Sequence, residues 1–170
     1  MRSKDPFAEL GIPARFDVSP RELRAAWMRQ AALSHPDAAG AVEESARVNE
    51  AMRVLSDPIL RAHALLALRG AAGVEAPKMQ PSLLLEMVEL RERADTCAHD
   101  GSALAELRAE AVARRDAAIT DVTALFAAAP EGALDPACLD RILAELNTIR
   151  AFDRMLEQLD REAGDPGDAS

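Results

Sequence analysis

The chain has few aromatic residues and few cysteines. Only 3% of its 170 residues are aromatic, and tyrosine is absent. A core made mostly of Ala, Leu, Val, Ile and Met favours packed helices over sheets. The two cysteines, Cys97 and Cys138, form no CxxC pair. We therefore expect reduced or buried thiols and no disulfide framework.

Long apolar runs are also missing. No stretch of the sequence reaches the roughly 20 apolar residues that a transmembrane helix needs. The first residues lead straight into helix-like sequence, so we expect no secretory or transit peptide. Together these features predict a cytoplasmic protein that does not bind membranes.

The net charge of −9 is unevenly distributed. Residues 1–70 hold ten basic and nine acidic residues, whereas residues 71–170 hold ten basic and twenty acidic ones. A near-neutral half followed by an acidic half indicates two modules with different partners. The acidic half argues against nucleic acid, whose phosphates must be neutralised by Lys and Arg.

Start and stop signals for helices recur along the chain. Ser19-Pro20 and Asp57-Pro58 each place a capping residue before a proline at the first helical position. The patterns predict helices over 5–10, 19–34, 42–56, 57–69, 82–99, 103–128 and 135–163. We expect an all-α protein with a first module over 1–70, a Pro- and Gly-containing linker over 71–81, a three-helix bundle over 82–163 and a disordered tail over 164–170.

The helix expected over 19–34 has two different faces. Leu23, Ala26 and Trp27 share its apolar face, and its opposite half carries three arginines, Arg21, Arg24 and Arg29. Such a face is ordinarily just solvated.

The helix expected over 82–99 has two apolar stripes, whereas a surface helix needs only one. Its first stripe, Leu83, Met87, Leu90 and Ala94, is enough to pack a bundle. A second stripe, Leu84, Leu85 and Val88, lies on nearly the opposite side together with Glu89 and Glu92. Either this helix is buried all round, or the second stripe is a binding patch with an acidic rim.

Catalytic and metal-binding patterns are sparse. No serine lies in a nucleophile elbow and no glycine-rich phosphate loop follows a strand, so we expect no enzyme. Cys97 and His99 offer two metal ligands where a zinc site needs four, and Cys138 is distant in sequence. Inert thiols are the favoured interpretation, with no metal and no cofactor. His35-Pro36-Asp37 forms a short polar loop between two helices, and as a tripeptide it indicates only a turn.

The neighbours of this loop carry a family resemblance. The opening Asp5-Pro6-Phe7-Ala8-Glu9-Leu10-Gly11, the loop itself and the run from Val48 to Pro58 resemble a J-domain, the module that stimulates DnaK-type ATPase chaperones. More narrowly, 11–16, 61–66 and 83–92 are similar to HscB, the J-domain co-chaperone of iron–sulfur cluster assembly. That resemblance implies an antiparallel helical hairpin with flanking short helices, followed by a three-helix bundle that binds the IscU scaffold.

The resemblance also implies roles for individual residues. His35, Pro36 and Asp37 match the loop that triggers ATP hydrolysis by an HscA/DnaK-type chaperone, and Arg21, Arg24 and Arg29 lie on the helix that docks there. Ala32 occupies a position where many J-domains have a basic residue. The residues that match the scaffold-binding positions are Leu84, Leu85, Val88, Glu89, Glu92 and the region of Phe152.

Three hypotheses follow from the sequence. In the first, the chain is an adaptor that presents an IscU-type scaffold to an HscA-type chaperone and stimulates the chaperone's ATPase. The second is a general J-domain protein for another client, with the bundle as a dimerisation domain. The third is a metal- or cluster-binding protein that uses Cys97, His99 and Cys138.

Overall fold

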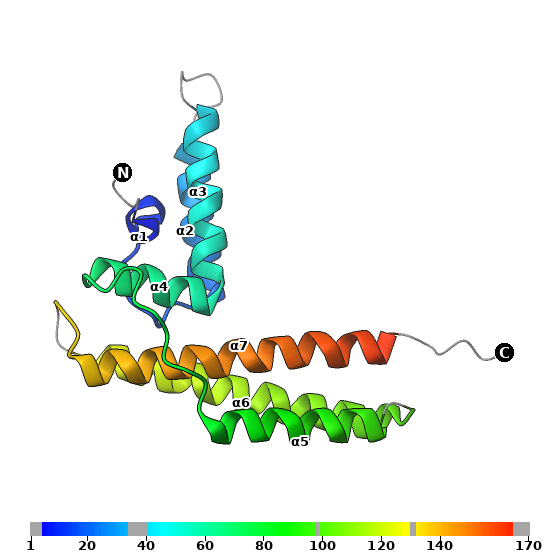
Figure 1. Cartoon of the computed structure of the whole chain (residues 1–170). Helices are drawn as coiled ribbons and strands as arrows, with labels where there is room; N and C mark the ends of the chain where they lie inside the picture. Colours follow the sequence, from blue (N-terminus) through cyan, green and yellow to red (C-terminus); the bar gives the residue numbers. More distant parts are fainter. Residues whose placement is uncertain (1–4, 34–40, 98, 130–131, 165–170) are drawn as a thin grey trace. The chain divides into compact units, whose positions relative to one another are not determined.

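The computed structural model describes residues 5–33, 41–97, 99–129 and 132–164, and every regular element within these ranges is an α-helix. The predicted all-α class is therefore confirmed. The helices, in chain order, are α1 (Pro6–Leu10), α2 (Pro20–Leu33), α3 (Ala41–Ser56), α4 (Pro58–Leu68), α5 (Pro81–Cys97), α6 (Gly101–Ala128) and α7 (Pro136–Gly164) (Figure 1).

The chain divides into two compact units. The first comprises Met1–Val74 with Phe126–Leu134, and the second comprises Glu75–Leu125 with Asp135–Ser170. Within the second unit, the Asn147 side-chain amide donates to the Pro77 carbonyl at 2.9 Å, so part of the expected linker is held by the bundle. Of the expected tail, Gly164 is the last residue of α7, and 165–170 lie outside the described residues.

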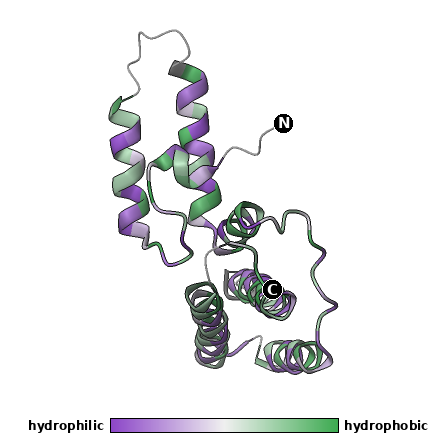
Figure 2. Cartoon of the chain, turned by 90° about the vertical axis from the view of Figure 1, so that its left-hand side faces the viewer, coloured by the Kyte–Doolittle hydropathy of each residue, from purple (hydrophilic) through white to green (hydrophobic). Residues whose placement is uncertain are grey.

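The first unit is built around the α2–α3 hairpin. Leu23 and Ala26 of α2 are buried with Val48, Ala51 and Leu55 of α3. The register of the pair is fixed where the Trp27 indole N–H donates to Oδ1 of Asn49 at 2.9 Å. Hydrophobic and hydrophilic residues alternate along both helices, as expected of helices with one apolar face (Figure 2).

Capping explains where the short helices of this unit begin and end. Asp5 accepts from the Phe7 amide at 2.9 Å, and Asp57 accepts from the amides of Ile59 and Leu60. Gly11 ends α1 in the left-handed conformation, at φ 62°. The aspartate caps satisfy amides that have no partner within their own helix.

Replacing Gly11 with alanine is expected to destabilise the first unit by about 1–2 kcal/mol, because the φ is unfavourable for an L-residue. An added Cβ would also lie 2.9 Å from Nε2 of Gln30. Urea denaturation followed by Trp27 fluorescence measures this, since Trp27 is the only tryptophan. Gly101→Ala is the matched control: no atom lies within 4 Å of its added Cβ, so it should not lower stability. Equal midpoints for the two variants would contradict the strain argument.

The second unit is a three-helix bundle with a shared core. Its centre combines side chains from each helix: Leu83, Leu90 and Ala94 of α5, Leu104, Leu107 and Ala111 of α6, and Ala151, Phe152, Met155 and Leu159 of α7. Ion pairs cross the surface of the bundle. Arg93–Glu110 and Arg114–Glu86, both at 2.7 Å, join α5 to α6, and Arg108–Asp160, also at 2.7 Å, joins α6 to α7.

One buried aromatic residue lies near the end of α6. Phe126 is buried, whereas its neighbour Leu125 is half-buried. Within the first unit the Phe126 ring stacks on Phe16, with the ring centroids 5.5 Å apart. The guanidinium groups of Arg61 and Arg69 lie over these two rings. Helical periodicity does not reveal this contact, because Phe16 belongs to a loop.

Candidate functional site

The exposed side of α2 carries the three predicted arginines. Arg21, Arg24 and Arg29 are all exposed, and none of them takes part in an ion pair among the described residues. Leu23 and Ala26 hold the opposite side of the helix in the core. The fold therefore presents an uncompensated basic face.

The loop that follows this face falls outside the described residues. His35, Pro36 and Asp37 belong to 34–40, between the last residue of α2 and the first of α3. What the structure does describe is the two helices that the loop joins. The Trp27–Asn49 hydrogen bond and the buried side chains around it hold these helices together.

The second predicted site is a patch on α5. Leu83, Leu90 and Ala94 are buried, whereas Leu84, Leu85 and Val88 are 51%, 60% and 53% exposed. Of the two alternatives, the helix buried all round is therefore wrong. Monomeric proteins rarely leave large apolar side chains together in solvent, so this exposure favours the predicted binding patch. We call Leu84, Leu85 and Val88 the α5 patch.

An acidic groove lies between α5 and α6, on the side of α5 that carries Glu89 and Glu92. It has a volume of about 590 Å³, and its lining from α5 includes Glu89, Glu92 and Cys97. From α6 it receives Glu106 and Leu107. The α6 side of this groove is not predictable from the sequence, because the periodicity of a helix does not show which other helix it pairs with.

The Arg93–Glu110 ion pair joins the two helices that form this groove. Arg93 donates to both carboxylate oxygens of Glu110, at 3.0 and 2.7 Å. This hydrogen bonding lowers the pKa of Glu110 below its ordinary value, so the carboxylate stays ionised to a lower pH than an unpaired glutamate would. Glu89, Glu92 and Glu106 form no ion pair among the described residues. Their carboxylates are therefore available to a basic partner.

Phe152 does not belong to the exposed surface. Its side chain is 0% exposed within the bundle core, and the Arg114 guanidinium lies 5.5 Å from the ring centroid. The ring itself is therefore not accessible on the surface of the bundle, and binding of a partner by the region of Phe152 stays a prediction. The stripe of α7 passes through Phe152 on its way from Ile149 to Met155, and all three side chains are buried.

The Phe152→Ala variant tests this reassignment. It is expected to lower the stability of the second unit by about 3–5 kcal/mol, the usual cost of emptying a buried aromatic site. Urea denaturation followed by circular dichroism measures the loss, and Phe152→Leu should cost less. Unchanged stability together with lost binding of a partner would instead place the ring in an interface.

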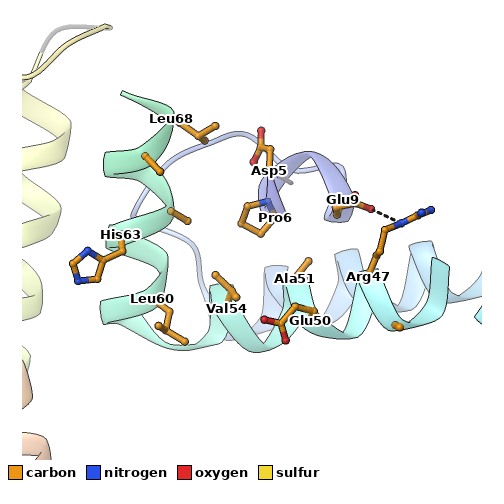
Figure 3. A pocket seen from close by; sticks show the side chains of 13 residues that line it. Asp5, Pro6, Glu9, Arg47, Glu50, Ala51, Val54, Leu60, His63 and Leu68 are labelled. Carbon is orange, nitrogen blue, oxygen red and sulfur yellow. Dashed lines mark ion pairs between the residues drawn. The ribbon is translucent and has the colours of Figure 1, made fainter. Parts of the chain in front are cut away.

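A second groove lies in the first unit between α1, α3 and α4 (Figure 3). It has a volume of about 790 Å³, and its lining includes small side chains such as Ala51 and Ala64. Its carboxylates are largely neutralised: Glu9 pairs with Arg47 at 3.5 Å, and Glu50 pairs with Arg53 at 2.6 Å. No serine, threonine or cysteine lines it. The groove therefore has no hydroxyl or thiol nucleophile among the described residues that line it.

Known proteins resemble this chain over most of its length. The co-chaperone protein HscB homolog of Bordetella petrii is 35% identical over 170 residues, which cover 88% of this chain and 98% of the relative. The chain belongs to the HscB co-chaperone family. The HscB homolog of Bordetella parapertussis is 40% identical over 124 residues, which cover 65% of this chain and 71% of the relative.

The HscB assignment extends to the fold. The family described as HSCB C-terminal oligomerisation domain matches residues 79–160. The chaperone HscB from Vibrio cholerae superposes with a TM-score of 0.76 at 22% identity, over 93% of this chain and 96% of that one. Human co-chaperone HscB superposes with a TM-score of 0.77 at 20% identity, over 95% of this chain and 83% of the human one. At such identities these structures establish the shared HscB fold, an N-terminal J-domain with a C-terminal helical domain.

The described residues of this HscB-family chain form no metal-binding cluster. Cys97 and Cys138 are half-buried free thiols. No group of three or more His, Cys, Asp and Glu side chains within the described ranges is arranged to hold a metal ion. Among the same residues, no helix combines the length and the apolar character needed to cross a bilayer.

Proposed function

We propose that this HscB-family chain is a two-ended adaptor. Its first unit stimulates the ATPase of an HscA/DnaK-type chaperone, and its second unit binds an IscU-type iron–sulfur scaffold and delivers it to that chaperone. The chain itself performs no covalent chemistry. The cytoplasmic location expected from the sequence stays a prediction.

The observation that carries this proposal is the exposure of the α5 patch. Leu84, Leu85 and Val88 are each at least half exposed on a helix whose other side is fully packed. Glu89 and Glu92 lie beside them, and both are exposed. A small apolar centre with a charged rim suits an interface that forms and dissociates during each chaperone cycle.

The basic face of α2 supports the chaperone end. Arg21, Arg24 and Arg29 are exposed and free of ion pairs among the described residues, so their guanidinium groups are available to a partner. Arginine favours such contacts because its guanidinium is weakly hydrated and donates several hydrogen bonds in one plane. We propose that this face docks on an acidic surface of the chaperone while His35, Pro36 and Asp37 trigger hydrolysis.

Titration calorimetry with the two purified partners tests the adaptor. Wild-type chain should bind the scaffold and, separately, the ATP-bound chaperone, with the second interaction weakening as salt is raised. Binding of neither partner would refute the proposal. If only one partner binds, the role assigned to the unit for the other partner is refuted.

A second candidate function rests on the description of the matching family. That description calls the region matching 79–160 an oligomerisation domain. In this alternative the α5 patch joins two copies of the chain, and the protein serves a different client. Light scattering separates the two: the adaptor predicts a monomer that captures the scaffold, and the alternative predicts a dimer that does not.

A further inference from the structure

The exposed face of α2 contains a large apolar side chain among its arginines. Met28 is 59% exposed, although the core side of the same helix is well packed by Leu23 and Ala26. Neither the charge pattern nor the family resemblance assigns it a role. The exposed large apolar side chains of the second unit are the α5 patch, so Met28 belongs to a different surface.

Helical geometry puts Met28 near the centre of the basic face. Arg21 and Arg24 precede it by seven and four residues, which places them on its side of the helix. Arg29 follows it and lies about 100° further round. The three arginines thus flank Met28 on its N-terminal side and on one lateral side, and each of them is exposed.

Small side chains leave Met28 prominent. Ala25 and Ala32, three residues before it and four residues after it, are its helical neighbours, and both are exposed. Arg24, four residues before Met28, is the long neighbour on this side, and Met28 nevertheless remains 59% exposed. Residues that contribute most to binding usually lie at the centre of an interface. They are apolar or aromatic, neighbouring side chains shield them from water, and charged residues lie at the edge.

We propose that Met28 is the apolar anchor of the chaperone contact, and that the arginines around it are its charged rim. The inference rests on the proposed function of the first unit and names the partner's chemistry. The docking surface on the chaperone is acidic and holds an apolar depression that takes one unbranched side chain. Methionine suits this role, because its flexible, polarisable thioether adapts to the shape of a pocket.

Anchor and rim affect different rate constants. Losing a buried apolar contact mainly speeds dissociation, whereas losing a rim charge mainly slows association and reduces its dependence on salt. Met28→Gln should therefore raise the dissociation rate about tenfold with an unchanged salt slope. Arg24→Gln should slow association and flatten the salt slope.

Kinetics of the full chain on the immobilised, ATP-bound chaperone provide the test. Leu33→Gln is the matched control, since Leu33 is more exposed, at 73%, but lies about 140° round the helix from Met28. Its rates should equal those of wild type. Met28→Arg decides between anchor and charge: the anchor predicts faster dissociation, and a purely electrostatic face predicts tighter binding.

The possible results separate this inference from the proposed function. If wild type does not bind the chaperone, the proposed function fails. If wild type binds and Met28→Gln dissociates at the wild-type rate, only the anchor fails. Faster dissociation of Leu33→Gln to the same degree, or a wild-type dimer that Met28→Gln dissociates in sedimentation velocity, would also overturn it.

Discussion

Replacing Leu84, Leu85 and Val88 together with alanine is expected to weaken binding of the IscU-type scaffold by about 100-fold. Each truncation removes apolar surface whose burial contributes about 1 kcal/mol, and three such losses correspond to about two decades in Kd. Because all three side chains are exposed in the free chain, the fold should not change. Titration calorimetry measures the Kd, and circular dichroism should stay helical.

The matched control for the α5 patch is Leu68→Ala. Leu68 is also a half-exposed leucine on a helix, but it belongs to the first unit. This variant should bind the scaffold as wild type does. Unchanged scaffold affinity in the triple variant would refute the patch, and equal weakening in both would point to general surface hydrophobicity.

Replacing His35 with glutamine is expected to abolish stimulation of the chaperone's ATPase while leaving scaffold binding intact. The resemblance to J-domains places His35 in the loop that triggers hydrolysis, and glutamine removes the imidazole at a similar size. His35 lies outside the described residues, so this prediction depends on the sequence together with membership of the HscB family. Single-turnover ATP hydrolysis measures the effect.

Two readouts make the His35→Gln result interpretable. Trp27 fluorescence should be unchanged, which excludes unfolding of the first unit, and scaffold affinity should match wild type. Stimulation that persists in this variant would mean that the first unit does not act as a J-domain. His35→Gln and the α5 patch variant should thus each remove one activity and preserve the other.

Much of the fold follows from local signals in the sequence. Asp57 caps a helix as expected, Asp5 caps α1 in the same way, and Gly11 takes the left-handed conformation that ends α1. The surplus stripe of α5 also follows from angles alone, because side chains on opposite sides of a helix cannot share one small core. These features depend on neighbours within a few residues, which is why the sequence predicts them.

The features that the sequence analysis missed depend on contacts between distant segments. The acidic groove needs Glu106 of α6 to lie opposite Glu89 and Glu92 of α5. Phe152 is buried in a core that side chains of α5 and α6 share with α7, and the sequence of α7 alone does not show that shared core. Phe126 is buried through its contact with Phe16, far away in the sequence.

ATP hydrolysis by the cognate chaperone, measured with and without the scaffold, tests the adaptor most directly. Wild-type chain should accelerate hydrolysis, and adding the scaffold should accelerate it further. The α5 patch variant should retain the first effect and lose the second. Hydrolysis that does not respond to the wild-type chain, or a scaffold effect of equal size in the patch variant, would contradict an adaptor with two separate ends.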